Sequence, residues 1–508
     1  MPASRSAVKV LIANRGEIAL RVIRACRELS FGTVAVYSDC DRSALHVRAA
    51  DEAYHLGPSP AVDSYLRIDK LIEIAIRSGA TLVHPGYGFL AENDTFAAAC
   101  VEAGLTFVGP DPHVIALMGG KTSAREVAVA ADVPIVPGTR EPFDAGTPLA
   151  EIAAAAAVVG YPLLVKAVAG GGGKGMRAVA RAEDLADAVT TARSEAGAAF
   201  GDSAIYLERR LIEPRHIEIQ LLADRHGTVL PFVERECSIQ RRHQKVVEES
   251  PSPVLAPETR EAMAAAAARV AAQVGYTGAG TIEFLLDDSG AFYFLEMNTR
   301  LQVEHAVTEM VTGIDLVQWQ LRIALGERLT VAPGQALTPR GHAIECRIYA
   351  EDPDRGFLPS PGLVRALSVP GGPGVRDDRG VAACFDIPTF YDSLISKLIV
   401  WGETREDAIS RLRRVLDEYR VVGVSTTLPF FRWLVDQPAF AVGRFSTTYL
   451  DDILATRSEP FVLPTNDDTL DALVATAVAG WLRAHRALSA GGSVGRAWRD
   501  TGRRESLR

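Results

Sequence analysis

The chain contains little lysine and no recognisable cysteine pattern. Of its 54 basic residues, seven are lysine, at positions 9, 70, 121, 166, 174, 245 and 397, and the other 47 are arginine. A compact ammonium and a planar guanidinium bind anions differently, so each position that remains lysine invites a specific reason. The six cysteines form no C-x-x-C pair, which argues against a zinc site or a disulfide framework. This usage is typical of a reducing, cytoplasmic environment.

Long hydrophobic runs and an excess of positive charge are also missing. The longest apolar stretch, residues 152–165, is too short to span a bilayer and contains Gly160 and Pro162, and the N-terminus has no signal-like run. A net charge of −9 and a pI near 5.7 argue against nucleic acid or an anionic membrane as the main partner. A phosphate ligand would therefore have to be met by locally placed positive charge.

The length of 508 residues, with 48% hydrophobic and 23% charged residues, predicts several packed units. The N-terminal predicted domain starts with a βαβ motif. It consists of a buried strand at 8–13, a tight turn at 14–16, a helix at 17–29 and a strand at 33–37. Strands at 81–83 and 105–108 would continue a parallel sheet, and the loop 84–93 would leave the carboxyl end of one strand, where ligands gather. The turn has one glycine where a dinucleotide-binding loop needs three, so that interpretation is weak.

A glycine-rich loop marks the next predicted domain, which we expect to begin near residues 134–138. Lys121 opens a helix, a strand follows at 163–166, and four consecutive glycines at 170–173 separate it from a strand at 177–180. Such a run lets backbone N–H groups approach an anion and lets the loop open and close. The alternative is a floppy hairpin tip. A P-loop is excluded because its Lys-Ser/Thr pair and following helix are missing.

The stretch 281–304 holds the densest set of chemically useful residues. Residues 281–286 and 291–297 predict a β-hairpin around a turn at 287–290, in which Glu283 faces Phe294 and is the diagonal neighbour of Glu296. Two carboxylates that close repel unless a proton or cation lies between them, and Asn298 adds a hard oxygen suited to Mg²⁺. Run as an extended segment, residues 296–304 would place their polar side chains on one face. The alternative is an edge hairpin whose polar face is solvated.

Other segments add polar faces of their own. Residues 215–220 alternate as a strand with His216, Glu218 and Gln220 on one side, and residues 341–349 place Glu345 and Arg347 together. The basic and amide run 237–245, taken alone, is more typical of a solvated loop than of a site.

The C-terminal part of the chain predicts helices. A capping box at 404–407 predicts a helix that reaches Tyr419. The tail from 464 predicts one amphipathic helix and a basic end, which either packs on its own domain or docks on a partner.

Together these motifs resemble the biotin carboxylases of the ATP-grasp superfamily, from about residue 8 to residue 450. The resemblance is carried by residues 13–18, 84–89, 170–176, 240–245 and 296–304. It implies an α/β protein with a Rossmann-like N-terminal domain at 1–120. An ATP-grasp domain at 121–330 would follow, with a mobile lid at about 138–208. An α+β C-terminal domain at 340–452 and a helical basic tail at 453–508 would complete the chain.

The resemblance also implies roles for individual residues. Nucleotide binding falls to Lys121, Lys166, Gly172, Gly173, Glu208, Arg209, Arg210, Leu211, His216, Gln240 and His243. The magnesium ligands would be Glu283, Glu296 and Asn298. The bicarbonate site would contain Lys245, Arg300, Gln302, Val303 and Glu304, with Glu304 as general base, and Arg347 would hold biotin. Family members commonly have an acid before the first phosphate lysine, where this chain has Gly120.

The implied activity is ATP- and bicarbonate-dependent carboxylation of biotin, with Mg²⁺ or Mn²⁺, as the first half-reaction of an acetyl- or acyl-CoA carboxylase in fatty acid biosynthesis. No methionine precedes a lysine, so the Met-Lys-Met biotin acceptor is missing and biotin would arrive on a biotin carboxyl carrier protein. Carboxyltransferase subunits and a homodimer, with Arg21 and Arg24 as interface candidates, are further implied partners. The alternatives are another carboxyphosphate-forming ATP-grasp ligase, such as a carbamoyl-phosphate synthetase domain, and a nucleotide-binding subunit without turnover.

Overall fold

The structure is a computed structural model that describes residues 8–168, 175–462 and 474–483. Its contacts divide the chain into two units, residues 1–457 and residues 458–508. In the second unit, residues 474–483 form a helix whose apolar side chains Val474, Val478, Trp481 and Leu482 are exposed. The rest of the predicted tail helix lies outside the described residues.

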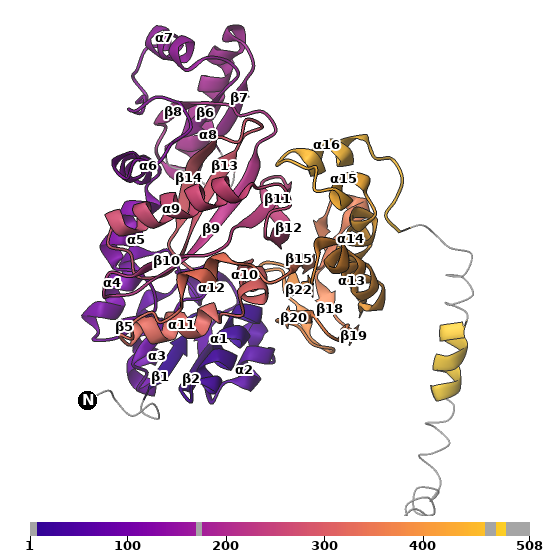
Figure 1. Cartoon of the computed structure of the whole chain (residues 1–508). Helices are drawn as coiled ribbons and strands as arrows, with labels where there is room; N and C mark the ends of the chain where they lie inside the picture. The colour runs from indigo at the N-terminus through magenta and orange to yellow at the C-terminus, as the bar shows by residue number, and fades with distance from the viewer. Residues whose placement is uncertain (1–7, 169–174, 463–473, 484–508) are drawn as a thin grey trace, which may run out of the picture. The chain divides into compact units, whose positions relative to one another are not determined.

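The first unit begins with the predicted parallel sheet. Its five strands are β1 (Lys9–Ile12), β2 (Gly32–Ser38), β3 (Glu52–Gly57), β4 (Leu82–His84) and β5 (Thr106–Phe107), in the order β3-β2-β1-β4-β5. The covering helices are α1 (Gly16–Glu28), α2 (Leu45–Ala49), α3 (Ile68–Ser78) and α4 (Asp94–Glu102), and α5 (Pro112–Gly119) and α6 (Lys121–Ala130) follow (Figure 1). Apolar side chains of these strands and helices are buried against one another, as the sequence pattern predicts.

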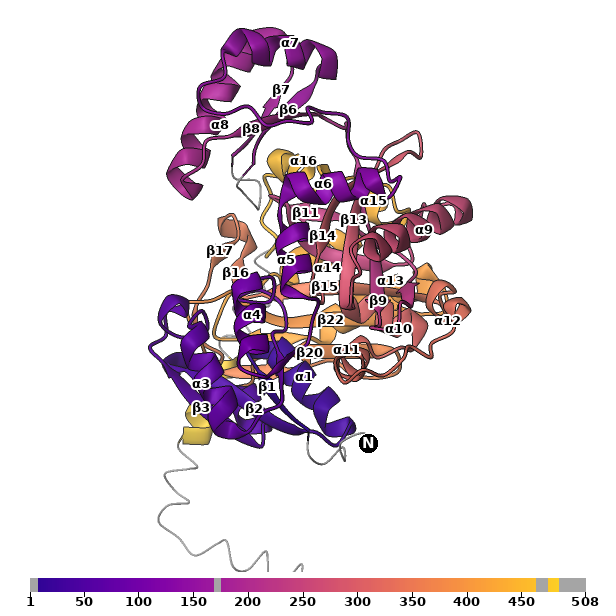
Figure 2. The ribbon, with the colours of Figure 1, turned by 90° about the vertical axis from the view of Figure 1, so that its left-hand side faces the viewer.

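A small subdomain follows, in which three strands carry helices on one face. The strands β6 (Leu163–Ala167), β7 (Met176–Val179) and β8 (Ile205–Arg209) are ordered β7-β6-β8. Helices α7 (Leu149–Val159) and α8 (Leu185–Phe200) share a core with these strands. In Figures 1 and 2 this group lies apart from the other sheets of the first unit. Residues 169–174, which include the predicted phosphate-binding glycines Gly172 and Gly173, lie outside the described residues.

A large antiparallel sheet forms the centre of the first unit. It runs in the order β14-β13-β9-β11-β12-β15-β22-β20, with β10 beside β9. Its bounds are β9 (Arg215–Ala223), β10 (Val229–Pro231), β11 (Arg235–Arg241), β12 (Gln244–Ser250), β13 (Gly278–Leu286), β14 (Phe292–Asn298), β15 (His342–Tyr349), β20 (Val375–Arg379) and β22 (Leu394–Gly402). Helices α9 (Pro257–Gln273), α10 (His305–Thr312), α11 (Leu316–Ala324) and α12 (Pro333–Leu337) complete this region.

The C-terminal part of the first unit contributes three strands to this sheet and adds short ribbons and helices. The ribbons pair β16 (Glu351–Asp352) with β17 (Leu358–Pro359), β18 (Gly362–Leu363) with β21 (Asp386–Ile387), and β19 (Ala366–Ser368) with β23 (Arg420–Val422). The helices are α13 (Arg405–Glu418), α14 (Leu428–Val435), α15 (Pro438–Ala441) and α16 (Tyr449–Thr456). The predicted capping box is present: Thr404 and Asp407 exchange side-chain and backbone hydrogen bonds at the start of α13.

Three local expectations from the sequence are wrong. Glu283 is directly opposite Glu296, not diagonal to it, because Phe284 pairs with Phe294 and a bulge between Glu283 and Phe284 then shifts the register once more. The extended segment does not continue to Glu304, since β14 ends at Asn298 and Glu304 is the residue before α10. The run 237–245 is not a solvated loop. It forms the tip of the β11–β12 hairpin, in which the turn residues Arg242 and His243 have positive φ.

No helix in the described part of the chain is both long and apolar enough to cross a membrane.

Candidate active site

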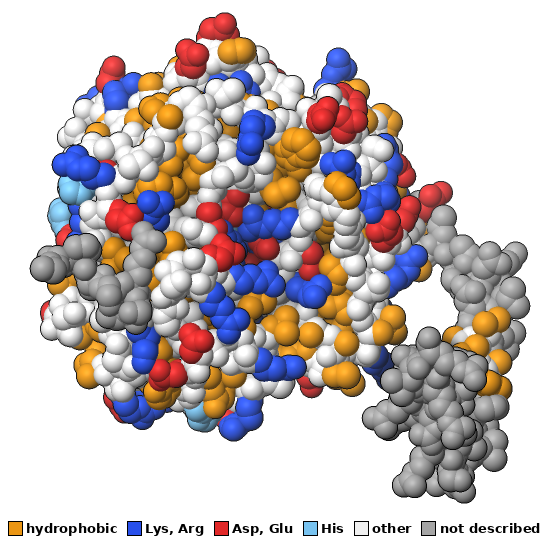
Figure 3. Space-filling model, turned by 60° about the horizontal axis from the view of Figure 1, so that its bottom comes forward, with side chains coloured by type: hydrophobic (Ala, Val, Ile, Leu, Met, Phe, Trp, Pro, Cys, Tyr) orange, Lys and Arg blue, Asp and Glu red, His pale blue; other side chains and the backbone are white. Residues whose placement is uncertain are grey.

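The parallel-sheet region, the small subdomain, the large sheet and the C-terminal part of the first unit all line one cleft of about 1390 Å³. All the candidate site residues in the described part of the chain line it except Glu304, which is buried beneath its surface. They are Lys121, Lys166, Glu208, Arg209, Arg210, Leu211, His216, Gln240, His243, Lys245, Glu283, Glu296, Asn298, Arg300, Gln302, Val303 and Arg347. In the view of Figure 3, acidic and basic side chains lie side by side in a hollowed part of the surface.

Lys245 is the central cation at the bottom of the cleft. Its Nζ donates hydrogen bonds to Glu218 at 2.6 Å, Glu283 at 2.9 Å and Glu304 at 2.7 Å. Burial alone would lower the pKa of Lys245, but the three carboxylates outweigh it and hold the pKa well above its usual value. The ammonium is therefore charged, and it connects residues from β9, β12, β13 and the start of α10.

Glu304 is fully buried between two cations. One carboxylate oxygen accepts from Lys245, and the other accepts from the Arg347 guanidinium at 3.0 Å. Burial raises the pKa of a carboxyl group, yet Lys245 and Arg347 outweigh burial and hold the pKa of Glu304 well below its usual value. Arg347 also binds Glu248 at 2.6 Å, and burial raises the pKa of Glu248 to about 7. Glu304 is thus ionised and fixed in direction.

The predicted magnesium ligands gather at the end of the β13–β14 hairpin. Glu283 accepts hydrogen bonds from the amides of Asn298 at 2.9 Å and Gln302 at 3.0 Å. The Glu296 side chain is accessible from the cleft. The surrounding protein atoms keep water away from its carboxylate, and this desolvation, together with the charge of Glu283 opposite, raises the pKa of Glu296 to about 7. Two carboxylates in direct opposition, one of them with such a raised pKa, fit a hard divalent cation, and the amide oxygen of Asn298 suits the same ion.

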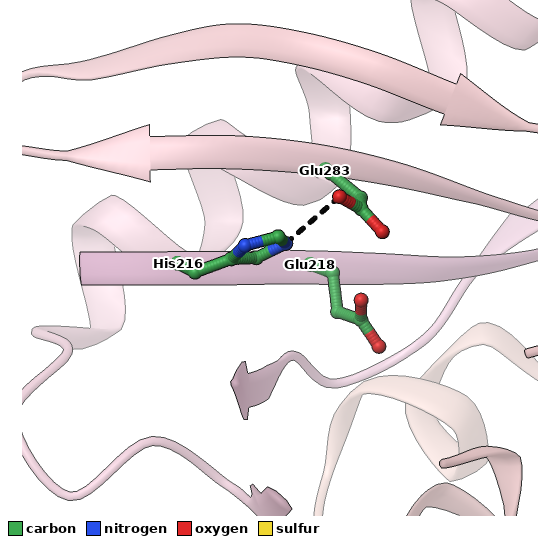
Figure 4. Close-up of side chains that lie close together, drawn as sticks. All are labelled: His216, Glu218 and Glu283. Atoms are coloured by element: carbon green, nitrogen blue, oxygen red, sulfur yellow. Dashed lines mark ion pairs between the residues drawn. The ribbon is translucent and has the colours of Figure 1, made fainter. Parts of the chain in front are cut away.

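Strand β9 adds a carboxylate that the sequence analysis did not assign to the site. His216 and Glu218 project from β9 beside Glu283, and His216 Nε2 lies 2.9 Å from Glu283 (Figure 4). Ligand atoms of these three residues lie within 4.8 Å of one another. Glu218 also accepts from the buried Arg235 of β11. The alternating polar face of residues 215–220 was the signal for Glu218, whereas nothing local marked Arg235.

A second group of charges lies at the end of the cleft next to the small subdomain. Lys166 of β6 and Arg125 of α6 both bind the carboxylate of Glu208 on β8. Lys121 is the first residue of α6, after the N-cap residue Gly120. Burial and the nearby charge of Lys166 lower the pKa of Lys121. Lys121 at the start of a helix and Lys166 on the neighbouring strand repel each other, and the pair favours an anion between them.

Arg300 lines the cleft from the loop after β14. Its guanidinium binds Glu92 at 2.7 Å, Asn298 Oδ1 at 3.1 Å and Gln302 Oε1 at 3.1 Å. The loop therefore positions a cation at the surface of the cleft although it is not a strand. The polar faces of β9 and β11 also meet in the cleft, where Gln240 Nε2 lies 3.0 Å from His216 Nδ1.

A large cleft with an antiparallel sheet as its floor and a small three-stranded, lysine-bearing subdomain beside it defines an ATP-grasp ligase. Family models agree along the chain: residues 6–115 match "Biotin carboxylase, N-terminal domain", residues 120–332 match "Carbamoyl-phosphate synthase L chain, ATP binding domain", and residues 345–452 match "Biotin carboxylase C-terminal domain".

Whole proteins match equally well. Biotin carboxylase from Nostoc sp. is 51% identical over 448 residues, which cover 88% of this chain and 99% of that protein. Biotin carboxylase 1 from Bacillus subtilis is 49% identical over 444 residues, which cover 87% and 98%. The biotin carboxylase domain dimer of Hydrogenobacter thermophilus 2-oxoglutarate carboxylase, solved with MgADP, ADP and bicarbonate, has a TM-score of 0.84 at 46% identity and covers 90% of this chain and 99% of that one.

The chain belongs to the biotin carboxylase family. It is an ATP-dependent ligase that carboxylates biotin.

Proposed function

We propose that the residues of this cleft carboxylate the N1′ atom of biotin with ATP and bicarbonate, and that Glu304 is the general base. The observation that supports this is the placement of Glu304, which is ionised, buried and held between Lys245 and Arg347. A base must be fixed within hydrogen-bond reach of the proton that it takes. A related domain from Hydrogenobacter thermophilus binds MgADP and bicarbonate, so the same ligands are proposed here.

In the first step, bicarbonate gives its proton to Glu304 and its oxygen attacks the γ-phosphorus of ATP. The bond to ADP breaks and carboxyphosphate forms. Bicarbonate that enters beside Lys245 and Arg300 would share their charge, which would raise the pKa of Glu304 toward a value suited to proton transfer. Lys121 and Lys166 would hold the phosphate oxygens. A magnesium ion held by Glu283, Glu296 and Asn298 would neutralise phosphate charge.

In the second step, carboxyphosphate breaks down to CO₂ and phosphate. The phosphate takes the N1′ proton of biotin, Arg300 stabilises the resulting enolate, and the N1′ atom forms a bond to CO₂. Arg347 would hold biotin in this proposal. Coverage of the cleft by the small subdomain would exclude water, which otherwise hydrolyses carboxyphosphate.

The partners of the enzyme are also proposals. We infer that biotin arrives on a carrier protein and that carboxyltransferase subunits take up the product, as in acetyl- or acyl-CoA carboxylases of fatty acid biosynthesis. The related Hydrogenobacter thermophilus domain forms a dimer, which supports a homodimer here. Of the two interface candidates, Arg24 is exposed, whereas Arg21 is buried and binds Glu309 at 2.9 Å and Asp315 at 2.8 Å. Arg24 is therefore the better candidate.

The substitution Glu304→Gln tests the proposal because it keeps the shape of the side chain and removes the base. We expect ATP binding to persist, measured by nucleotide titration, and the release of ADP with bicarbonate and free biotin to fall by at least about 10²-fold. Unchanged bicarbonate-dependent ADP release would remove Glu304 from this role. Stimulation of ADP release by free biotin in the wild-type enzyme separates the proposal from a carbamoyl-phosphate synthetase type of reaction and from a nucleotide-binding protein without turnover.

A further inference from the structure

Lys397 is a buried lysine that the proposed chemistry leaves without a role. It lies on β22 in the C-terminal part of the first unit, and its side chain is 0% exposed. An ammonium removed from water is strongly destabilising unless nearby groups compensate its charge. The chain uses arginine at 47 of its 54 basic positions. The contacts of Lys397 should therefore indicate why a compact ammonium is present.

The shortest contact of Lys397 leads to the bicarbonate end of the cleft. Its Nζ donates a hydrogen bond to the carbonyl oxygen of Val303 at 2.8 Å. Two acids balance the charge from a greater distance, Glu17 of α1 at 3.5 Å and Asp378 of β20 at 4.0 Å. The two acids face the ammonium from farther away, while its hydrogen bond holds the backbone of the turn before α10.

The sheet places Lys397 beside another cation of the site. In the register of β15 and β22, Lys397 is opposite Arg347, so the two side chains leave the same face of the sheet. Arg347 holds the carboxylate of Glu304, and Lys397 holds the carbonyl of Val303, the preceding residue. Neighbouring strands therefore fix two consecutive residues of one turn, one through its side chain and one through its backbone.

We propose that Lys397 is a positioning residue for the bicarbonate site. Its hydrogen bond sets the path of residues 302–304 and thereby the direction of the Glu304 carboxylate. This inference rests on the proposed function, in which Gln302, Val303 and Glu304 meet bicarbonate. It assigns no contact with substrate to Lys397, which acts through Val303. Charge alone does not explain the residue, because the two acids lie farther away than the carbonyl oxygen.

The substitution Lys397→Met tests the proposal because methionine has a similar length and no donor. We expect the KM for bicarbonate to rise by roughly tenfold or more, the factor associated with one charge-assisted hydrogen bond. The KM for ATP should stay within about twofold, since Lys121, Lys166 and Glu208 are unchanged. A fall in kcat alongside the higher KM for bicarbonate is expected, because Glu304 loses its direction. Equal increases in both KM values, or an unchanged KM for bicarbonate, would overturn the proposal.

A second variant and a control keep the result interpretable. Lys397→Gln retains an amide donor one bond short of the ammonium, so its KM for bicarbonate should lie between those of the wild type and Lys397→Met. Arg379→Met is the matched control, because Arg379 is the neighbour of Asp378 on β20, pairs with Asp377 at 3.2 Å and is partly exposed. Its KM for bicarbonate should not change. Failure of both Lys397 variants to fold would also count against the proposal.

Comparison with Glu304→Gln separates this inference from the proposed function. If Glu304→Gln keeps full turnover, the proposed function fails. If Glu304→Gln loses turnover while Lys397→Met keeps the wild-type KM for bicarbonate, only the role of Lys397 fails.

Discussion

The two ends of the cleft differ in how their charges are balanced. At the end floored by the large sheet, Lys245, Glu304 and Arg347 each have two or more oppositely charged partners. At the end next to the small subdomain, Glu208 is shared by Lys166 and Arg125, and the pKa of Lys121 is lowered by burial and by Lys166. The first end is assembled before substrate arrives, whereas the second favours an incoming anion. Substitutions at the sheet end should therefore affect kcat and the KM for bicarbonate, and those at the subdomain end the KM for ATP.

The largest effect is expected for Lys245→Met. This substitution removes the counter-charge shared by Glu218, Glu283 and Glu304, so the three buried carboxylates repel one another and the base loses its direction. We expect kcat for carboxylation of free biotin to fall by roughly 10³-fold. Steady-state kinetics measure this directly. Lys70→Met, which removes a lysine bound to the backbone carbonyls of Leu56 and Asp63, is the control. A larger change in the KM for ATP than in kcat would contradict the comparison.

A buried carboxyl group beside the sheet end should lower the stability of the folded protein. This group is Glu17 of α1, which lies 3.5 Å from Lys397. Burial raises the pKa of Glu17 from 4.5 to about 7, even though Lys397 opposes it. For a carboxyl group whose pKa is raised in the folded state, the contribution to stability is full below pH 4.5 and is lost as the pH rises to about 7. The raised pKa of Glu17 corresponds to a loss of about 3 kcal/mol in the free energy of unfolding above pH 7, at roughly 1.4 kcal/mol per pKa unit. Glu17→Gln should thus be more stable than the wild type at pH 8.

Thermal unfolding at several pH values measures this difference. The gain in Tm for Glu17→Gln should be small at pH 5 and should grow toward pH 8. A gain that is the same at every pH would show that the ionisation of Glu17 is not its cause.

A smaller effect is expected at the subdomain end for Lys166→Met. Loss of one phosphate-binding ammonium should raise the KM for ATP by roughly tenfold and leave the KM for bicarbonate unchanged. Arg125→Met is the matched comparison, because Arg125 shares Glu208 with Lys166 and also binds the carbonyl oxygen of Val136. It should raise the KM for ATP by only a few-fold. If Lys166→Met lowers kcat and leaves the KM for ATP unchanged, the two ends do not differ as proposed.

Sequence patterns predicted the elements of this fold better than the connections between them. The βαβ start, the β13–β14 hairpin and the capping box at Thr404 depend on local periodicity and local hydrogen bonds, and all are present. The predicted partner of Glu283 was wrong by two positions, Phe294 instead of Glu296, because the hairpin starts its pairing one residue later and a bulge after Glu283 adds a second shift; neither leaves a clear local mark. The turn before α10 was mistaken for a strand because polar and apolar residues also alternate there.

Contacts between residues that are distant in the sequence could not be predicted from local patterns. Lys397 and Val303 are 94 residues apart, and Arg347 and Glu304 are 43 apart. The alternation of β15 and β22 shows which side chains share a face, but not which turn of another region lies against that face. Arg347 was found through the resemblance to a family, and Lys397 was not found. The candidate metal ligands that were predicted from pattern alone, Glu283, Glu296 and Asn298, belong to one hairpin.

The scarcity of lysine has a consequence for chemical labelling of this enzyme. Lys397 is fully buried and Lys245 is enclosed by carboxylates, so neither amine is open to reagents that acylate amines. Lys121 differs from both, because its lowered pKa leaves a larger fraction of its amine unprotonated and nucleophilic at a given pH. Covalent modification at position 121 would therefore report on whether the cleft is occupied, with few competing amines elsewhere in the chain.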